Sequence, residues 1–294
     1  MDALAWEAEP PQLRSPILVC AFAGWNDAAG AATTAVTTAA ESLDADLIAQ
    51  VDPEEFFDFQ ANRPTISFTE GEARQIEWPG NVLLAATAPG AERDLVLLAG
   101  TEPNLKWRTF AEGLAETAQG LGVEMVVTLG ALIADVAHTL PVPITGLASD
   151  AELVERLDLQ RSSYEGPTGV VGVLHDACSR RAIPSASLWA AVPHYVAAVP
   201  NPKAALALLR RFGGLAGIAV EASELEEEAE SYERQVSNAV AANPEIQDLV
   251  ERLEREQADQ LELGKDIPSG ESLARDFERF LRQQGGPEGG GPTN

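Results

Sequence analysis

The sequence predicts an α/β protein in which helices flank a layered, mostly parallel mixed sheet, followed by a C-terminal helical extension. From Pro16 to about Gly214, short apolar runs alternate with amphipathic segments, which is the pattern of α/β layering. The runs 95–98 and 125–129 are almost unbroken and are closely followed by glycine, as expected of central parallel strands covered on both faces. After Gly214 no further run of strand type appears.

Eight short apolar runs bounded by turn residues are the candidate strands. They are residues 17–20, 47–51, 76–78, 82–86, 95–98, 125–129, 144–148 and 187–191. The region from Thr65 to Trp78 alternates in polarity around Glu70-Gly71-Glu72, which predicts an antiparallel excursion from the parallel sheet.

Amphipathic segments between these runs are the candidate helices. They are residues 28–42, 104–121, 150–157, 169–181 and 202–212. Asp150 and Asn201 are expected N-caps, the second followed by proline at the first helical position. The pair Gly213-Gly214 is expected to end the last of these helices.

The extension begins with an acidic helix. Ser223 and Glu226 have the spacing of a capping box, and Asn243-Pro244 is expected to end this helix and cap a second one. A third helix is expected from about Ser269. The predicted organisation is an N-terminal arm (1–15), an α/β domain (16–220), an acidic helical extension (221–283) and a disordered glycine-rich tail (284–294).

Composition and charge exclude several classes of partner. The net charge of −26 repels nucleic acid and anionic lipid surfaces, so neither is expected as a partner. No apolar run approaches the roughly 20 residues of a membrane helix, and the protein is expected to be cytoplasmic. Cys20 and Cys178 lie in apolar contexts typical of reduced core thiols. Residues 221–262 hold 14 acidic and 3 basic residues, which indicates either a solvated helical face or a docking surface for a basic partner.

The run Gly24-Trp25-Asn26-Asp27 lies between a predicted strand and a predicted helix. In an open α/β sheet such a turn lies at the carboxyl end of a strand, where ligands bind. Asp27 is a candidate to accept a proton, or to hold a ribose hydroxyl or a metal-bound water, and Trp25 to stack on a ring. Alternatively, Asp27 caps the helix and Trp25 anchors a loop or a partner subunit.

Three more loops follow predicted strands. Gly100-Thr101-Glu102-Pro103 leads to Trp107, and Glu102 is either a general base or ligand acceptor, or a cap for a helix starting near Asn104. Gly166-Pro167-Thr168-Gly169 precedes a helix, which suits an anion such as phosphate or an ordinary chain reversal.

Pro193-His194-Tyr195 follows the last predicted strand. His194 is the best placed of the three histidines for proton transfer, with Tyr195 as its neighbour; the alternative is a histidine in a packed corner or a subunit contact. His138 has less distinctive surroundings, and His175-Asp176 looks like an exposed helix face.

Several catalytic signatures are absent from the sequence. It contains no Gly-x-Ser-x-Gly elbow, Walker loop, Gly-x-Gly-x-x-Gly fingerprint or paired-Cys motif. We therefore expect no cofactor and no metal. Catalysis by scattered loop residues stays open.

Taken in order, Gly24-Trp25-Asn26-Asp27-Ala28, Arg63-Pro64, Gly100-Thr101-Glu102-Pro103 with Trp107, Gly166-Pro167-Thr168-Gly169 and Pro193-His194-Tyr195 resemble the proteasome assembly chaperone 2 family, in its actinobacterial branch. The resemblance implies a phosphorylase/hydrolase-like α/β sandwich and homo-oligomers, with a trimer favoured. It also implies that eukaryotic and archaeal relatives escort proteasome α-subunits and dock through a hydrophobic-Tyr-any tail. The present sequence ends Gly291-Pro292-Thr293-Asn294, so docking by that route is not expected.

Two functional hypotheses follow. The first is an oligomeric protein-interaction module, chaperone-like and proteasome-related, without catalytic activity, whose partners are itself and proteasome subunits. The second is a small-molecule-binding protein or an enzyme for a nucleoside-like or amide substrate at the carboxyl edge of the sheet, with Asp27, Glu102 and His194 as acid/base candidates. The residues predicted to bind a ligand or form an interface are Gly24, Trp25, Asn26, Asp27, Gly100, Thr101, Glu102, Trp107, Thr168, Gly169, His194 and Tyr195.

Overall fold

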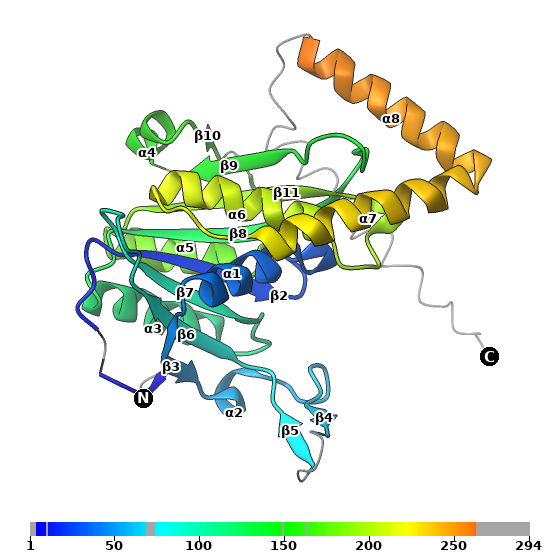
Figure 1. Ribbon diagram of the computed structural model, residues 1–294. Helices are drawn as coiled ribbons and strands as arrows, with labels where there is room; N and C mark the ends of the chain where they lie inside the picture. Colours follow the sequence, from blue (N-terminus) through cyan, green and yellow to red (C-terminus); the bar gives the residue numbers. More distant parts are fainter. Residues whose placement is uncertain (1–3, 10, 69–73, 149, 163, 263–294) are drawn as a thin grey trace, which may run out of the picture.

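The computed structural model describes residues 4–9, 11–68, 74–148, 150–162 and 164–262, and its centre is a mixed sheet (Figure 1). Nine strands form this sheet in the order β1-β3-β6-β7-β2-β8-β11-β9-β10. Their bounds are β1 (Leu4–Trp6), β2 (Ile17–Ala23), β3 (Asp46–Val51), β6 (Asn81–Ala86), β7 (Leu95–Thr101), β8 (Met125–Ala134), β9 (Ile144–Ala148), β10 (Gln160–Arg161) and β11 (Ser185–Pro193).

The four central strands β7, β2, β8 and β11 run parallel. This confirms the prediction made for β7 and β8 from the unbroken apolar runs 95–98 and 125–129. Ala23 pairs with Thr101 at the end of β2, and Pro193 pairs with Ala134 at the end of β11. The carboxyl ends of all four strands therefore lie at one edge of the sheet. The loops that follow them, including the predicted ones after residues 23, 101 and 193, all leave from that edge.

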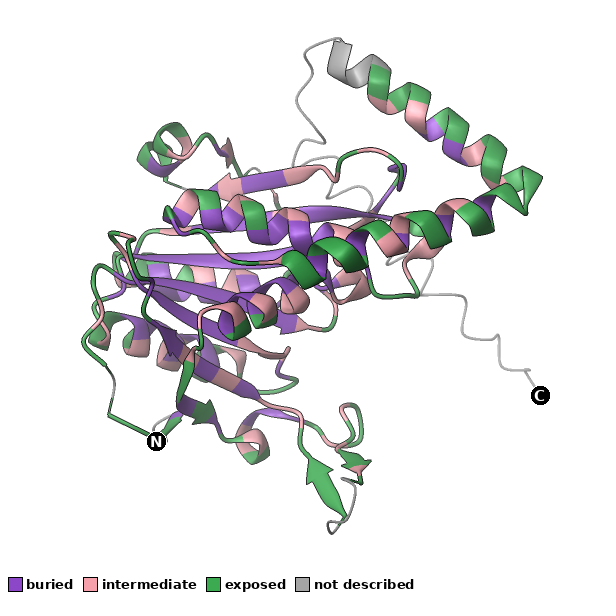
Figure 2. Ribbon diagram, viewed as in Figure 1, coloured by how far each residue is buried: buried purple, intermediate pink, exposed green. Residues whose placement is uncertain are grey.

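Helices cover both faces of the sheet (Figures 1 and 2). The short helix η1 (Ala28–Gly30), α1 (Ala31–Ser42) and α6 (Pro202–Ala216) pack on one core, and α3 (Trp107–Gly120) and α5 (Val170–Arg180) pack on the other. Short helices α2 (Pro53–Phe56), α4 (Ala151–Arg156) and η2 (His194–Val196) lie in the connections. Together with the parallel centre of the sheet, this layering confirms the predicted fold class.

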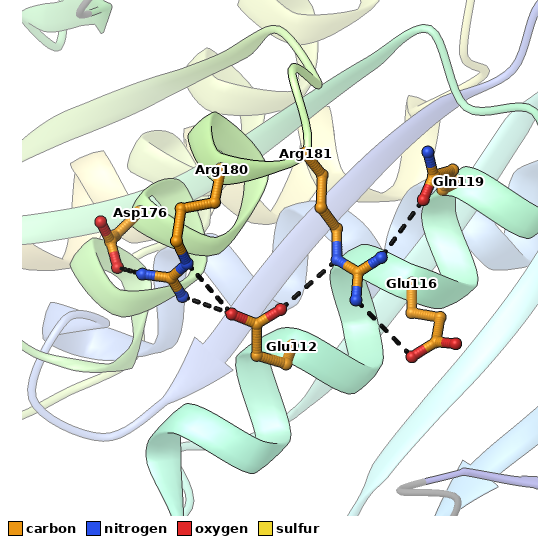
Figure 3. A network of polar contacts seen from close by, with 6 residues as sticks. All are labelled: Glu112, Glu116, Gln119, Asp176, Arg180 and Arg181. Carbon is orange, nitrogen blue, oxygen red and sulfur yellow. Dashed lines mark hydrogen bonds and ion pairs between the residues drawn. The ribbon is translucent and has the colours of Figure 1, made fainter.

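The exposed side of α3 is joined to the C-terminal end of α5 by the network of polar contacts in Figure 3. Glu112 on α3 accepts hydrogen bonds from both Arg180 and Arg181 at the end of α5. Arg180 also pairs with Asp176 one turn earlier, and Arg181 donates to Gln119. The network joins the two helices through residues that lie more than 60 positions apart in the sequence.

The acidic extension begins with α7 (Ser223–Ala241), which packs against α6, followed by α8 (Pro244–Glu262). Tyr232, Val236 and Val240 of α7 form a small third core with Val250 and Leu253 of α8. None of the helices in the described ranges has the length and apolar composition needed to span a lipid bilayer. The predicted domain boundaries stay a prediction, and the helix expected from Ser269 and the tail 284–294 lie outside the described residues.

The predicted capping box at Ser223 is wrong. Ser223 is already the first residue of α7, and its backbone N–H and hydroxyl both donate to the carboxylate of Glu221. The expected caps at Asp150 and Asn201 are confirmed, because each side chain accepts a backbone N–H from the first turn of its helix at 3.0 Å.

Two predicted helix ends need correction. The helix expected from residue 104 begins at Trp107, because Lys106 has a left-handed φ of 54°. Helix α6 continues past Gly213-Gly214 to Ala216 and ends where Gly217 adopts a φ of 70°. Glycine adopts this conformation without the steric cost that a side chain would add, which explains why the helix ends there.

The antiparallel excursion is confirmed as the two-stranded sheet of β4 (Thr65–Ser67) and β5 (Gln75–Glu77). Its turn, predicted at Glu70-Gly71-Glu72, lies outside the described residues. The short strands β1 and β10 were not among the predicted ones, because runs of two or three residues give no periodic signal.

Candidate functional site

Three of the predicted loops meet at the carboxyl edge of the parallel strands. A Cβ atom built on Gly169 would lie 2.6 Å from the side-chain nitrogen of Asn26, 2.6 Å from Oε1 of Glu102 and 3.5 Å from the ring of Trp25. A Cβ atom on Gly24 would lie 3.4 Å from Cβ of Glu102. Only glycine at position 169 leaves room for this approach. The sequence pattern therefore located a real cluster, formed by residues 145 positions apart at the extremes.

Glu102 holds the start of α5 in this cluster. Its Oε1 accepts the backbone N–H of Val170 at 2.8 Å, and its own backbone N–H donates to the carbonyl oxygen of Ala23 at 2.9 Å. The side chain thus caps α5, not the helix that follows Asn104 as the structural alternative supposed. An anion at the turn before α5 would meet this carboxylate, which removes the expected advantage of the site for phosphate.

Asp27 caps the other helix that starts at this edge. Its Oδ1 accepts the N–H of Ala32 at 2.6 Å, and its Oδ2 accepts the N–H of Thr33 at 3.3 Å and the hydroxyl of Thr33 at 2.5 Å. Burial raises the pKa of this carboxyl, while these three hydrogen bonds act in the opposite direction. The capping alternative therefore describes the geometry of Asp27.

The loop that carries Glu102 is held in place by contacts of its neighbours Gly100, Thr101 and Trp107. A Cβ atom on Gly100 would lie 2.3 Å from the carbonyl oxygen of Gly80, so β6 can approach β7 closely only because residue 100 is glycine. The carbonyl oxygen of Thr101 accepts a hydrogen bond from Asn81 at 3.0 Å. Trp107 donates its indole N–H to the carbonyl oxygen of Pro103.

Tyr195 packs against the core of the helical extension, whereas His194 pairs with the loop after β8. His194 Nδ1 lies 3.1 Å from Oδ1 of Asp135. The Tyr195 hydroxyl accepts the backbone N–H of His138 and is hydrogen-bonded to its Nδ1, both at 2.8 Å, while His138 Nε2 lies 3.1 Å from the hydroxyl of Ser237 on α7. Burial lowers the pKa of His138, with the Lys203 ammonium acting in the same direction. This motif therefore joins the edge of the sheet to α7.

A cavity of about 180 Å³ lies beside the cluster, between the first turns of α5 and the adjoining part of the sheet. Four predicted residues line it, Trp25, Asn26, Thr168 and Gly169, together with Trp189 of β11 and His175 of α5. The carboxylate of Glu102 lies next to Gly169. Asp27, Glu102 and His194 are not among the residues that line the cavity, so the three acid/base candidates do not share it.

His175 was expected on an exposed helix face, and this expectation is wrong. Its Nε2 lies 2.9 Å from the hydroxyl of Thr128, and its Nδ1 lies 2.8 Å from the hydroxyl of Ser185. Burial lowers its pKa to about 4. Helical spacing from Val171 and Cys178, both buried, is the signal that would have placed His175 on the inner face. Asp176 is exposed, as expected.

The cysteines and the possible metal ligands are the remaining groups that could carry chemistry. Cys20 and Cys178 are both buried and unpaired in disulfides, as predicted, and burial raises the pKa of Cys178 to about 11. Among the described residues, no three His, Cys, Asp or Glu side chains lie close enough together to hold a metal ion.

The sequence profile of the PAC2 family matches residues 21–240, three quarters of the chain. The chain belongs to the PAC2 family. A PAC2 family protein from Streptomyces avermitilis is 45% identical, with 80% of this chain and 99% of that chain covered and a TM-score of 0.74. A proteasome-assembly chaperone homologue from Mycobacterium tuberculosis is 44% identical, with the same coverage and a TM-score of 0.72. These PAC2 neighbours confirm the resemblance to the actinobacterial branch.

A third solved structure, a protein of unknown function from Mycobacterium tuberculosis, aligns with a larger share of the present chain than the first two do. It is 28% identical, covers 96% of both chains and has a TM-score of 0.83. A comparison with curated proteins gave no significant match.

Proposed function

We propose that this PAC2 family protein is a cytoplasmic, homo-oligomeric protein-interaction module with a chaperone-like, proteasome-related role and no catalytic activity. Membership of the family supports the role, because one actinobacterial neighbour, 44% identical, is named as a proteasome-assembly chaperone homologue. The positions of the acid/base candidates support the absence of catalysis. Two of the three are carboxylates that cap helices, and none lines the cavity.

One surface feature supports binding to protein. The β4–β5 sheet projects from the body of the molecule in Figures 1 and 2 and carries exposed apolar side chains. We call them the hairpin patch: Ile66, Phe68, Ile76 and Trp78, whose exposed fractions are 44%, 77%, 51% and 50%. The Trp78 ring packs against Phe59, with ring centroids 4.8 Å apart, and this contact holds the patch against the preceding loop. Apolar groups gathered on a projecting element are typical of contact surfaces.

We assign the hairpin patch to contacts between copies of this chain, with three copies in the assembly. An isolated two-stranded hairpin is only marginally stable in water, because it has little apolar surface to bury by itself. Packing against a neighbouring copy would bury the apolar side chains and support both strands. The net charge of −26 keeps the rest of the surface mutually repulsive, which favours a contact through this uncharged patch.

Light scattering coupled to size-exclusion chromatography tests the assembly. The full chain is expected at three times its mass of 31.2 kDa. The double substitution Phe68→Ser and Trp78→Ser is expected to shift it to monomer, whereas Val199→Ser, also at an exposed apolar position, leaves the mass unchanged. A monomeric parent chain, or a trimer that survives the double substitution, contradicts the assignment.

Native mass spectrometry with purified actinobacterial proteasome α-subunits tests the proteasome-related role. We expect a complex that contains both chains and weakens at high salt if the acidic extension takes part in docking. Separate peaks for the two proteins at micromolar concentration would contradict this role while leaving the oligomer untouched.

A further inference from the structure

We propose that the cavity beside α5 is a binding site for a neutral, planar ring that carries a carbonyl group. The proposal does not depend on the protein-interaction role. Three features of the described residues support it: the size and aromatic walls of the cavity, one buried donor that has no partner among them, and a lining without Asp, Glu, Lys or Arg.

The size and walls of the cavity suit a single ring. Its volume is about 180 Å³, and an apolar cavity of about 150 Å³ is large enough to bind benzene. Trp25, Tyr164 and Trp189 supply aromatic surface, and Leu132, Leu147 and Val171 supply aliphatic surface. Aromatic rings pack favourably against such surfaces by offset stacking and edge contacts.

The walls are held in position by the sheet. A Cβ atom on Gly130 of β8 would lie 2.3 Å from the six-membered ring of Trp189, so this indole occupies space that only a glycine leaves open. The indole N–H of Trp189 donates to the hydroxyl of Ser187 at 3.0 Å, which fixes the orientation of the ring. The cavity is therefore preorganised, and a ligand need not order these side chains when it binds.

Asn26 supplies the polar recognition. It is only 6% exposed, and among the described residues its side-chain nitrogen has no hydrogen-bond partner. The loop that carries it is fixed, because the carbonyl oxygen of Asn26 accepts the backbone N–H of Ala131 at 2.8 Å. A buried N–H without a partner is costly. Because less than 1 Å² of this nitrogen is accessible, a small rotation of the Asn26 side chain is needed before a carbonyl oxygen on a ligand accepts its hydrogen bond and removes that cost.

The distribution of charge around the cavity disfavours charged ligands. Among the described residues, no Asp, Glu, Lys or Arg lines the cavity, and burial lowers the pKa of His175 to about 4, so its ring is neutral near pH 7. An anionic ligand would be repelled by the carboxylate of Glu102, which lies next to Gly169, a residue of the cavity wall. A cation would gain little from Glu102, since its Oε1 already accepts the N–H of Val170. The structure therefore selects for neutral rings.

Binding to the full-length chain is measured by calorimetry and by quenching of tryptophan fluorescence. The probes are benzamide and nicotinamide, with benzoate and nicotinate as charged partners of nearly the same shape and toluene as a ring without a carbonyl. We expect the two amides to bind at least tenfold more tightly than the two carboxylates and more tightly than toluene. Equal binding of amides and carboxylates overturns the proposal, as does the absence of saturable amide binding.

Two variants locate the site. Asn26→Leu keeps the approximate shape of the side chain and removes the donor, so amide affinity is expected to fall about tenfold while toluene binding is retained. Leu147→Phe fills the cavity from a partly exposed position on β9 and is expected to abolish binding of every ring. Ile144→Phe is its control, because residue 144 lies on the same strand but does not line the cavity.

The remaining outcomes also discriminate. Amide binding that survives Leu147→Phe overturns the proposal. A change of oligomeric mass in Leu147→Phe, without one in Ile144→Phe, would make the cavity a subunit contact and would likewise overturn it. Substitutions in the hairpin patch leave ring binding unchanged, so failure of the oligomer assignment and failure of this proposal are separate results.

Discussion

Glu102 accepts the backbone N–H of Val170, 68 residues later in the chain, at 2.8 Å. The contact ties the end of β7 to the start of α5. It passes over Gly169, where a side chain would collide with Oε1 of Glu102. One carboxylate thereby holds the α5 side of the cavity and occupies the N-terminus of that helix.

Removal of this cap is expected to destabilise the protein. Glu102→Ala should lower the free energy of unfolding by about 1 kcal/mol, the usual effect of losing a helix N-cap, whereas Glu102→Gln keeps an acceptor oxygen and should lose less. Urea denaturation followed by circular dichroism measures the difference. Glu116→Ala is the control, because this glutamate lies on the exposed side of α3 and its ion pair with Arg181 is long, 3.6 Å. Equal stability of Glu102→Ala and the parent chain would contradict the capping role.

Substitution of two glycines by alanine is expected to change the free energy of unfolding in opposite directions. Gly130→Ala places a methyl group 2.3 Å from the Trp189 ring and should destabilise the chain by about 1 to 3 kcal/mol through overpacking. Gly214→Ala, at an exposed position in α6 with nothing within 4 Å of the new methyl group, should stabilise it by about 0.5 to 1 kcal/mol. Thermal unfolding of both variants measures the two signs. Gly130→Ala should also change the tryptophan emission spectrum.

Asp94 is expected to make stability depend on pH in the acid range. Its side chain is 1% exposed and accepts from Arg14 and from the N–H of Ala88. The hydrogen bond from the Arg14 side chain is the main cause that lowers its pKa to about 2 from the ordinary 3.8. The unfolded chain therefore takes up the proton first, so the stabilisation is complete above about pH 4 and is lost as the pH falls to about 2.

Asp94→Asn checks this dependence. At pH 7 it should cost about 1 to 2 kcal/mol, a value reduced for the exposure of Arg14 to solvent. Denaturation measured between pH 2 and pH 7 should show a smaller loss in the variant than in the parent chain. Parallel curves would exclude Asp94 as the cause.

His175 makes a second contribution, at higher pH. Burial lowers its pKa from 6.5 to about 4, so it remains neutral in the folded protein where the unfolded chain is already protonated. Its contribution is complete above about pH 6.5 and is lost as the pH falls to about 4, with a total of up to about 3 kcal/mol. His175→Gln should flatten the stability curve between pH 6.5 and pH 4. An equally steep curve in the variant would show that other groups titrate there.

Tyr195→Phe tests how the extension is attached. The variant loses the hydroxyl that accepts the N–H of His138 and contacts its ring, while the shape of the aromatic ring is kept. Hydrogen exchange should become faster in α7 and stay unchanged in α3, because α7 contacts this cluster through Ser237 and α3 lies in the other core. Unchanged exchange in α7 would mean that the apolar contacts alone hold the extension.

The central strands could be predicted because both faces of each are buried, which leaves a continuous apolar run in the sequence. The convergence of residues 24–27 and 102 followed from one rule, that parallel strands place their carboxyl ends at one edge. Gly169 reaches the same edge for another reason, because it precedes α5, which leads into the parallel strand β11. The position of Trp189 in the cavity could not be predicted. It depends on Gly130 in the neighbouring strand, and register between strands distant in the sequence has no local signal.

The partners of the polar groups were the least predictable part. Glu102 follows its strand at a position equally suited to capping the nearby helix, and only the spatial neighbourhood of α5 decides which N–H it accepts. His138 looked undistinguished because its partners, Tyr195 and Ser237, lie 57 and 99 residues away. Hydrogen bonds between residues so far apart in the sequence depend on the folded structure, and no local sequence pattern predicts them.

The place of β2 in the sheet has a consequence for biosynthesis. This strand is complete by residue 23, yet it lies between β7, which ends at Thr101, and β8, which ends at Ala134. The edge that pairs with β7 therefore stays open to wrong pairings until residue 101 has been synthesised, and the edge that pairs with β8 until more than a hundred residues have followed β2. We therefore expect the sheet to close around β2 only after β8 has been synthesised, with a risk of aggregation of the nascent chain until then.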